Sequence, residues 1–413
     1  MPDDVDELRV DAGRLLGELK TLARFGATPA GGVNRPAYSA EDITARAHVR
    51  EMMRAAGLEP RVDAAGNTIA RRTGRDTRAA PIVIGSHTDS VPDGGRFDGA
   101  LGVMAAIEVA RTLAERGAVL RHPLEVVDFQ NEEGGLVGSR AMAGRLPHDE
   151  LERQATSGRT IAEGIRLLGG DPDRLDEACR PAGSNAGYLE LHIEQGRVLE
   201  RAGAEIGVVE GIVGIRYWEV AFEGVASHSG TTPMPDRHDA LLAGARFVEA
   251  VHGTVTSVPG RHVGTVGRLT ASPGAPNVIA GRVSLTLELR DLRPEVIDAL
   301  FVRIEDEARR IARETGTTVS LVRTHGTEPA PTDPRVRQAV AESARALGLR
   351  PLPMPSGAGH DAQNMVALGP SGMLFVPSVN GLSHTPLERT EDRDVVNGAN
   401  VLLGGVLRMD AAL

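Results

Sequence analysis

The chain has 413 residues, more than one hydrophobic core usually holds, so two domains are expected. Its formal net charge of −10 argues against a nucleic-acid or anionic-membrane surface. The single cysteine, Cys179, excludes an internal disulfide, and the acidic N-terminal stretch MPDDVDELRV lacks the apolar region of a signal peptide. The single cysteine fits a reducing cytosol, and no run approaches the roughly 18 apolar residues of a membrane span, so we expect a cytoplasmic protein without a membrane span.

Helical and strand patterns alternate through the first half of the chain. Ser39 fits an N-cap with Asp42 three residues later, and Gly117 is expected to end the third helix. The predicted elements are helices at 6–25, 40–56 and 99–116 and strands at 82–86, 124–129 and 187–193. This alternation predicts an α/β domain with a mixed, mostly parallel sheet flanked by helices.

The pattern changes from about residue 206. Residues 206–222 alternate like half-exposed strands, and residues 283–289 alternate strictly between apolar and other side chains. The next predicted elements are helices at 236–252 and 294–314, the second starting at Pro294, and strands at 262–269, 282–290 and 317–322. The order β-α-β-β-α-β is that of a ferredoxin-like unit.

The last part of the chain returns to the first pattern, with a helix at 335–347 and an apolar strand at Met373–Val376. We therefore predict a discontinuous main domain at 1–210 and 329–413. A second domain at 211–328 is expected to be inserted in it, with hinges near 210–214 and 326–330.

Clusters of His and carboxylate side chains stand at the ends of four predicted strands. His87 follows 82–86, the Glu132–Glu133 pair follows 124–129, His192 closes 187–193, and His384 follows Met373–Val376. A single histidine or a glutamate pair in such a position is usually structural or solvated. Because ligands bind outside the carboxyl ends of strands in open α/β sheets, four coincidences together predict one functional site.

Asp98 has two interpretations. It directly precedes the predicted helix at 99–116, where an aspartate often serves as N-cap. Alternatively, it belongs to the cluster, since it lies eleven residues after His87 across a glycine-rich loop. We favour the second interpretation, because the neighbouring motifs already point to the same place.

Three histidines and at least two acids suit two borderline divalent ions such as zinc, manganese, cobalt or nickel. Asp98 is the candidate bridge between the two ions. Such a pair polarises a carbonyl and lowers the pKa of a water, which then needs a base. Of Glu132 and Glu133, one can bind metal and the other can act as that base. Asp89 is expected to orient the His87 imidazole.

The motifs resemble those of the dinuclear zinc exopeptidase superfamily. They are most similar to its amidase/hydantoinase/carbamoylase branch, which includes N-carbamoyl-L-amino acid hydrolases, bacterial-type β-ureidopropionases and allantoate amidohydrolases. The resemblance extends from about residue 10 to residue 410. It rests on the stretches GSHTDS (85–90), GGRFDG (94–99), NEEG (131–134), LHIEQG (191–196), GVASHSGTTPM (224–234), APNVIAG (275–281), ELRD (288–291), SGAGHDA (356–362) and GLSHTPLE (381–388).

The resemblance implies a dinuclear metal site with Zn²⁺, or with Mn²⁺, Co²⁺ or Ni²⁺. One ion would be held by His87, Asp98 and His192, and the other by Asp98, Glu133 and His384. Glu132 would then be the general base.

The resemblance also implies a homodimer in which the inserted domain is both lid and dimerisation domain. His228 would come from the partner subunit and stabilise the oxyanion, while Asn277 and Arg290, also on that domain, would grip the substrate carboxylate. Gln195 and the loop carrying Gly357 and His360 would complete the pocket. On the sequence alone, His228 also fits an ordinary loop histidine, and Arg290 also fits a surface ion pair with Glu288 or Asp291.

The resemblance further implies hydrolysis of the ureido C–N bond of an N-carbamoyl-L-amino acid or N-carbamoyl-β-amino acid to the amino acid, ammonia and CO2. The alternative is hydrolysis of allantoate or a related ureide. A peptidase, an aminoacylase or a binding protein without metal fits less well. One departure concerns residues 134–140, where the loop is shorter than in many family members. Because this loop lies beside the predicted metals, it bears on the exact substrate.

Overall fold

A computed structural model describes residues 8–413, which cluster into two compact units. Unit 1 comprises the described residues up to Gly211 together with Pro331–Leu413, and unit 2 is Ile212–Ala330. Among the described helices, none is both long enough and apolar enough to cross a bilayer. Each unit has its own apolar core.

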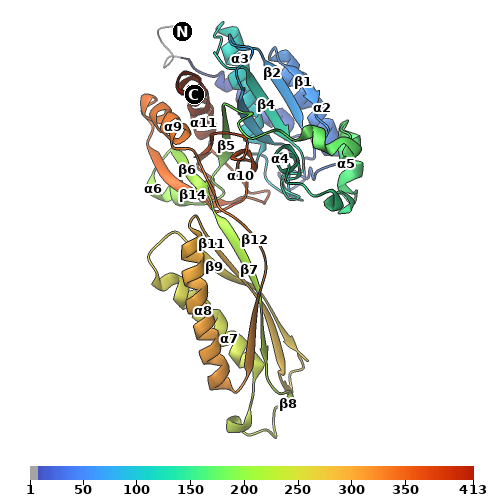
Figure 1. Cartoon of the computed structure of the whole chain (residues 1–413), viewed down its shortest axis with the longest axis vertical. Coiled ribbons are helices and arrows are strands. Elements are labelled where there is room, and N and C mark those ends of the chain that lie inside the picture. Colours follow the sequence, from blue (N-terminus) through green and yellow to red (C-terminus); the bar gives the residue numbers. More distant parts are fainter. Residues whose placement is uncertain (1–7) are drawn as a thin grey trace. The chain divides into compact units, whose positions relative to one another are not determined.

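Unit 1 is built on a mixed nine-stranded sheet in the order β1-β2-β4-β3-β5-β15-β6-β13, with β14 paired to β6 (Figure 1). Its strands are β1 (Glu59–Val62), β2 (Thr68–Arg72), β3 (Ile82–His87), β4 (Leu124–Phe129), β5 (Gly187–Ile193), β6 (Ile206–Ile212), β13 (Ala330–Pro331), β14 (Pro351–Ser356) and β15 (Ser371–Val376). The four central strands β4, β3, β5 and β15 run parallel, and the neighbouring pairs β2–β4 and β15–β6 are antiparallel. The predicted fold class is confirmed.

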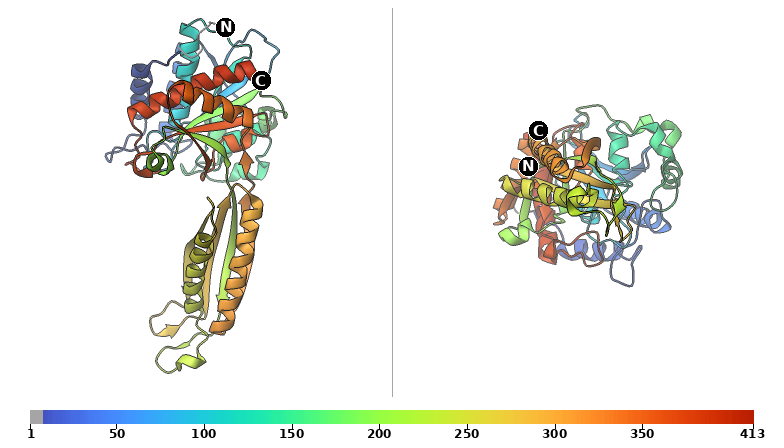
Figure 2. Two further views of the ribbon diagram at one scale, coloured as in Figure 1. Left: turned by 90° about the vertical axis from the view of Figure 1, so that its left-hand side faces the viewer. Right: turned by 90° about the horizontal axis from the view of Figure 1, so that it is seen from below.

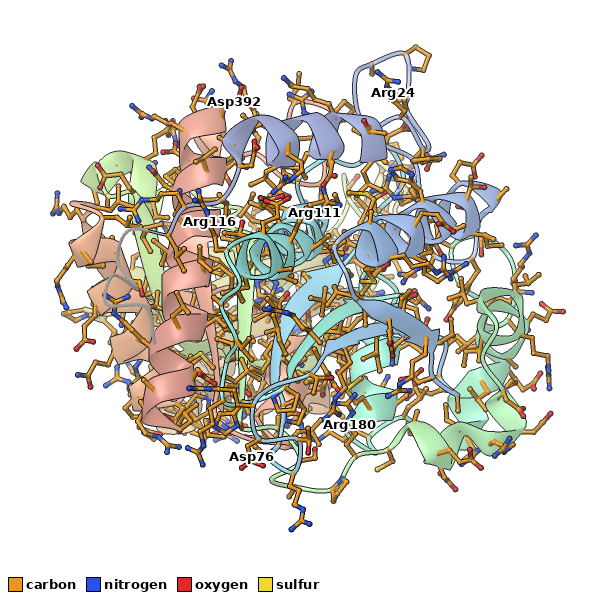
Figure 3. All side chains as sticks on the ribbon, turned by 90° about the horizontal axis from the view of Figure 1, so that it is seen from above. Arg24, Asp76, Arg111, Arg116, Arg180 and Asp392 are labelled. Atoms are coloured by element: carbon orange, nitrogen blue, oxygen red, sulfur yellow. The ribbon has the colours of Figure 1, made fainter. Side chains whose placement is uncertain are left out.

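The helices of unit 1 flank this sheet. They are α1 (Ala12–Leu22), α2 (Ala40–Ala55), α3 (Ala100–Glu115), α4 (Val137–Met142), α5 (Ile161–Leu168), α6 (Val198–Ala202), α9 (Pro334–Ala346), α10 (Ala362–Met365) and α11 (Asp392–Ala412). One apolar cluster joins α1, α2, α3, α9 and α11 to the central strands. Arg111 on α3, labelled in Figure 3, also donates a hydrogen bond to Glu18 on α1 at 2.8 Å, so a polar contact supplements the apolar packing of these two helices.

Two helix starts show how local chemistry sets the element bounds. The Ser39 side chain accepts the backbone N–H of Asp42, as predicted for α2. The first helix is shorter than the predicted 6–25, since Asp11 caps it by accepting the Arg14 N–H and the helix begins at Ala12. Residues 6 and 7 of that prediction lie outside the described residues.

Unit 2 contains an antiparallel sheet in the order β12-β7-β11-β9, made of β7 (Gly214–Glu223), β9 (Val263–Ser272), β11 (Arg282–Asp291) and β12 (Thr318–Thr327). Helices α7 (Ala240–Ser257) and α8 (Pro294–Thr315) lie side by side along the sheet (Figure 2). Every second residue of β11, such as Leu285 and Leu287, is buried in the core beneath them. This is the predicted ferredoxin-like order, and β8 (Ser227–His228) and β10 (Val278–Ile279) form a small separate ladder.

The strand pattern at 206–222 contains two strands with different surroundings. β6 belongs to the sheet of unit 1 and is almost entirely buried, whereas β7 belongs to unit 2 and alternates. The chain passes between the units at Gly211–Ile212 and returns at Ala330–Pro331. Short 3-10 helices lie at His148–Glu152, Pro172–Ala178, Met234–Asp236 and Val379–Gly381.

Candidate metal centre

The predicted ligands of unit 1 and the predicted base, Glu132, lie at one edge of the sheet. His87 is the last residue of β3, Glu132 and Glu133 follow β4, and His192 is the penultimate residue of β5. His384 follows β15. Because these four strands are adjacent and parallel, their carboxyl ends meet, and the structure brings all five side chains together.

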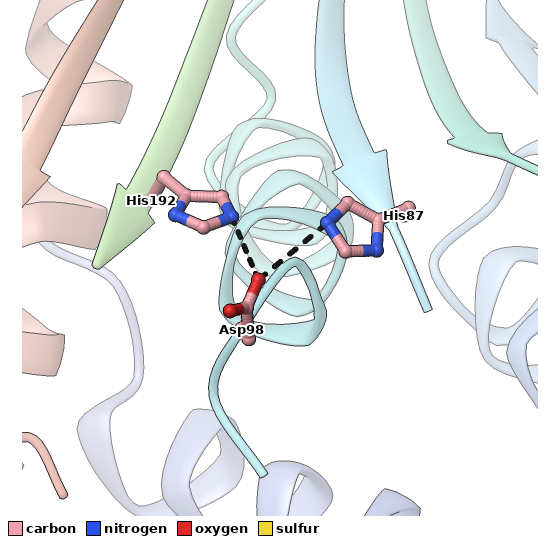
Figure 4. A group of neighbouring side chains, drawn as sticks. All are labelled: His87, Asp98 and His192. Carbon is pink, nitrogen blue, oxygen red and sulfur yellow. Dashed lines mark ion pairs between the residues drawn. The ribbon is translucent and has the colours of Figure 1, made fainter. Parts of the chain in front are cut away.

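Asp98 lies at the centre of this group. Its Oδ1 atom is 3.2 Å from His192 Nε2 and 3.7 Å from His87 Nε2 (Figure 4). Its Oδ2 atom is 3.3 Å from His384 Nε2, which in turn is 3.5 Å from Glu133 Oε2. The Asp98 carboxylate therefore faces two sets of side chains. Its Oδ1 atom faces His87 and His192, and its Oδ2 atom faces His384, with Glu133 beside it. Within each set the possible ligand atoms lie within 4.8 Å of one another.

Asp98 does not cap the helix that follows it. α3 begins after Gly99, and no side chain caps it. The Asp98 carboxylate instead accepts hydrogen bonds from Gln195 Nε2 and Ser383 Oγ, each at 2.8 Å. The N-cap interpretation of Asp98 is therefore wrong, and the cluster interpretation describes its contacts.

Backbone carbonyl groups orient the two buried histidines. His87 Nδ1 lies 3.0 Å from the backbone oxygen of Asp89, and His192 Nδ1 lies 2.9 Å from that of Ile193. A carbonyl only accepts, so each Nδ1 carries a proton, and each Nε2 faces Asp98. Burial lowers the pKa of His87 to about 4, which keeps that ring neutral.

Asp89 contacts the His87 imidazole through its backbone oxygen and not through its carboxylate. Its Oδ1 is 3.8 Å from His87 Nδ1, too far for a hydrogen bond, and the Asp89 backbone oxygen takes that role. The carboxylate instead accepts the backbone N–H groups of Glu132 and Glu133, both at 3.2 Å. Buried Arg46 on α2 lies 3.6 Å from it and completes a support that the sequence analysis missed.

We expect Asp89→Asn to lower kcat/KM by about tenfold to hundredfold, the usual effect of losing a residue that orients site groups. The asparagine amide would place N–H donors against the Glu133 N–H, and the charge facing Arg46 would be lost. The measurement is kcat/KM of the metal-loaded enzyme. Asp63→Asn is the matched control, since Asp63 is a buried acceptor of the Asn67 N–H in a turn elsewhere. A variant at Asp89 that behaves like this control would contradict the assigned role.

The two adjacent glutamates face different histidines. Glu133 Oε2 lies near His384, whereas Glu132 Oε2 is 3.8 Å from His87 Nε2. Burial and then the charge of Asp98 raise the pKa of Glu133 to about 8. Burial, followed by the charges of Asp361 and Glu133, raises the pKa of Glu132 well above its usual range.

The donor set fits divalent cations. Crowded carboxylates repel one another, and a cation between them would offset that repulsion. Glu133 Oε1 is buried without a hydrogen-bond partner, as expected for an oxygen that serves an ion. Imidazole nitrogens and carboxylate oxygens without thiolate are the ligands of zinc and similar borderline ions.

Three residues of the site adopt left-handed backbone conformations that non-glycine residues rarely adopt. They are Asn131 with φ 51°, Gln195 with φ 59° and His384 with φ 55°. Asn131 immediately precedes the glutamate pair. Such strained positions persist where the surroundings enforce them, and they concentrate at functional sites.

The predicted pocket residues of unit 1 have different surroundings. Gln195 already donates to Asp98 through Nε2, and its Oε1 is buried without a partner. His360 is buried, with its Nε2 3.0 Å from Ser356 Oγ and its ring centroid 4.5 Å from that of His192. Gly357 is exposed in the preceding loop.

In unit 2, His228 and Asn277 lie together at one end. β8 and β10 pair His228 with Val278, and the Asn277 backbone oxygen accepts the Ser229 N–H at 3.1 Å. His228 is exposed, and its Nδ1 accepts the Gly230 N–H at 3.0 Å. The neutral ring therefore carries its proton on Nε2, where it is available as a donor.

Arg290 lies at the other end of the same sheet. Arg282 is at the end of β11 that adjoins β8 and β10, and Arg290 is eight residues further along the same strand. At the usual rise of a strand, about 27 Å separates Arg282 from Arg290. Asn277 and Arg290 of one copy therefore cannot grip the same carboxylate, which corrects the prediction that this domain supplies both together. Arg290 is also ion-paired with Glu288, at 2.6 Å and 3.1 Å, as the alternative interpretation expected.

Similarity to known proteins assigns the chain to a family. Residues 83–408 match the model of Peptidase family M20/M25/M40, and the chain belongs to this family. It is 42% identical to an N-carbamoyl-L-amino acid amidohydrolase of Geobacillus stearothermophilus, over 95% of this chain and 97% of that protein. It is 35% identical to the allantoate amidohydrolase of Bacillus subtilis, over 93% of this chain and 94% of the relative.

A solved hydantoinase/carbamoylase family amidase from Burkholderia ambifaria has the same fold. It superposes with a TM-score of 0.91 at 39% identity and covers 97% of this chain and 98% of its own. The predicted resemblance to the amidase/hydantoinase/carbamoylase branch is thereby confirmed.

Proposed function

We propose that this protein is a metal-dependent amidohydrolase that removes the carbamoyl group from N-carbamoyl-L-amino acids or N-carbamoyl-β-amino acids. The products would be the amino acid, ammonia and CO2. The observation that carries the proposal is the cluster of three histidines and two acids around Asp98, found in a chain similar nearly end to end to an N-carbamoyl-L-amino acid amidohydrolase. A reducing cytoplasm suits a chain with one free cysteine.

The residues around Asp98 sort into two proposed ion sites. His87, Asp98 and His192 would hold one ion, and Asp98, Glu133 and His384 the other. The ligand types fit Zn²⁺, and they also fit Mn²⁺, Co²⁺ or Ni²⁺. When bound, such a pair supplies Lewis-acid polarisation of a carbonyl and makes a water more acidic.

Glu132 is the proposed general base. It is buried beside the cluster, and it is not part of either ligand set around Asp98. Its carboxylate would take a proton from the attacking water and return it to the leaving nitrogen. The Asp89 carboxylate would hold Glu132 in place by accepting the Glu132 backbone N–H.

Gln195 is proposed to select a substrate with N–H groups. Its Nε2 donates one N–H to Asp98, and its Oε1, a buried acceptor without a partner, would be available to a ligand. An acceptor in that position pairs with the NH2 of a carbamoyl group. This observation supports a ureido substrate.

A second copy of the chain is proposed to complete the site, with His228 and Asn277 from one copy and Arg290 from the other. The separation of these residues within unit 2 supports the division. β9 is an edge strand of the sheet in unit 2, with Val263 50% and Leu269 40% exposed. Such an edge, with apolar side chains, is suited to pair with the same strand of a second copy.

The shared site predicts complementation between inactive variants. His228→Ala and Arg290→Ala, co-expressed with different tags and purified as mixed dimers, should regain about half of the wild-type activity. One site of each mixed dimer would contain both native residues, and the other would contain neither. The controls are the homodimers of each variant, prepared with the same tags as the mixed dimers. Mixed dimers no more active than the homodimers would contradict the division of the site.

A substrate panel separates the proposed function from its alternatives. We would measure ammonia release from N-carbamoyl-L- and D-amino acids, N-carbamoyl-β-alanine and allantoate, and product release from N-acetyl amino acids and dipeptides. We expect the carbamoyl substrates to be preferred, with L over D. A preference for allantoate would support the alternative, ureide hydrolysis. The similarity to the allantoate amidohydrolase of Bacillus subtilis is the reason to include this substrate. Turnover of acyl or peptide substrates alone would overturn the proposal.

A further inference from the structure

A buried carboxylate outside the predicted ligand set holds the backbone around Asp98. Glu388 is 4% exposed, and its Oε1 accepts the backbone N–H groups of Phe97 at 2.8 Å and Asp98 at 3.1 Å. These contacts join segments about 290 residues apart in the sequence. The position of the Asp98 main chain is therefore set by a residue from the C-terminal part of unit 1.

Ser383 connects the same glutamate to the Asp98 side chain. Its Oγ lies 2.8 Å from Asp98 Oδ2 and 2.8 Å from Glu388 Oε2. Glu388 thus reaches Asp98 by two routes, directly through the backbone N–H and through the Ser383 hydroxyl, whose single proton is donated to one of the two carboxylates at a time. The two routes close a ring that fixes both the main chain and the carboxylate of Asp98.

The loop before α3 has the shape that this ring requires. A Cβ atom on Gly95 would collide with the Glu388 carboxyl group, so only glycine leaves room for it there. Gly99 has φ 63°, and a Cβ atom on it would collide with the His87 ring. The glycines on either side of Asp98 therefore admit the clamping residue and a predicted ligand.

Asp98 needs this precision because its two oxygens face opposite sets. Oδ1 faces His87 and His192, and Oδ2 faces His384. Rotation of the carboxylate would improve neither set and would misalign both. Ser383 also precedes His384 in the sequence, so the same contact ties that ligand loop to Asp98.

We propose that Ser383 and Glu388 are positioning residues that clamp Asp98 in the orientation that serves two ions at once. The inference rests on the metal centre proposed above. Without the clamp, Gln195 Nε2 would still donate to Asp98, but the Asp98 carboxylate would be less firmly oriented, and both ions would bind more weakly. Neither residue needs to touch the substrate.

The chemistry of the clamp predicts which substitution preserves it. In Glu388→Gln, Oε1 still accepts the two N–H groups, and the Nε2 amide donates to Ser383 Oγ, whose own proton then points to Asp98. In Glu388→Ala, both routes are lost. In Ser383→Ala, only the route to the carboxylate is lost.

Zinc titration of the metal-free protein tests the proposal without using activity. Asp410→Asn is the matched control, since Asp410 is a buried carboxylate that accepts the N–H groups of Arg121 and His122, each at 2.8 Å. We expect wild type and Asp410→Asn to bind two zinc ions with equal affinity. Glu388→Ala should bind zinc about tenfold to hundredfold more weakly, Ser383→Ala about tenfold more weakly, and Glu388→Gln within about threefold of wild type.

The outcomes separate the clamp from the metal centre. Wild-type protein that binds no zinc would overturn both. Two ions bound to wild type, with equal affinity in Glu388→Ala or without rescue in Glu388→Gln, would overturn the clamp alone. A purely structural role would lower the melting temperature of the metal-free variants and leave zinc affinity unchanged. If Glu388→Ala does not fold, Ser383→Ala decides, and wild-type zinc affinity in that variant overturns the clamp.

Discussion

Replacing Glu132 with glutamine is expected to lower kcat by about 10²- to 10⁴-fold, the range that general acid–base groups contribute, while both metal ions stay bound. The amide keeps the shape of the side chain and cannot accept the proton of the attacking water. Glu132 lies outside both candidate ligand sets around Asp98, so metal content should not change. The measurements are kcat on an N-carbamoyl-L-amino acid and metal per chain by elemental analysis.

Glu194→Gln is the matched control for this experiment. Glu194 is a buried glutamate that accepts the N–H groups of Val198 and Leu199 and has no place in the proposed chemistry. Its activity should remain within a few fold of wild type. If Glu132→Gln instead loses metal, Glu132 is a ligand, and the base must be sought elsewhere.

Replacing Asp98 with asparagine is expected to remove both ions rather than one. Asp98 lies within 3.7 Å of all three predicted histidine ligands, so each set would lose its shared negative charge and gain an amide. Since metal-dependent polarisation supplies much of the rate, kcat/KM should fall by about 10³-fold or more. The measurement is zinc per chain after equilibration with a zinc buffer, together with kcat/KM.

His384→Ala is the informative comparison for Asp98. His384 belongs to only one set, so this variant should retain about one ion per chain. Two ions retained by Asp98→Asn would contradict the bridging role. One ion lost from both variants would mean that Asp98 serves a single ion.

The sequence predicted the central strands well because their physics is local. The runs at 82–86, 124–129 and 187–193 are apolar and buried along their whole length, and β3, β4 and β5 fall within one residue of them. Helix α11 was not predicted, since Gly398 and Gly405 weaken its pattern. A Cβ atom at either glycine would crowd Leu189 or Leu191, so the glycines serve packing that only the folded sheet defines.

The ligand cluster of the candidate site was predictable from the sequence, whereas the contacts that support it were not. Histidines and acids that follow parallel strands must meet, whatever the rest of the chain does. The contacts of Arg46 with Asp89, and of Glu388 with the loop at Asp98, join distant segments and have no local signal. The separation of Asn277 from Arg290 follows from the register of β11 in its sheet, which one sequence does not reveal.

The measurement that tests the central claim most directly is ammonia release from a single N-carbamoyl-L-amino acid by three preparations. These are the chelated and dialysed protein, the same protein reloaded with two equivalents of zinc, manganese, cobalt or nickel, and the reloaded Glu132→Gln variant. We expect no turnover without metal, restored turnover in at least one reloaded sample, and turnover about 10²- to 10⁴-fold lower in the reloaded variant. Full turnover by metal-free protein, or none under any metal with this class of substrate, would contradict the account.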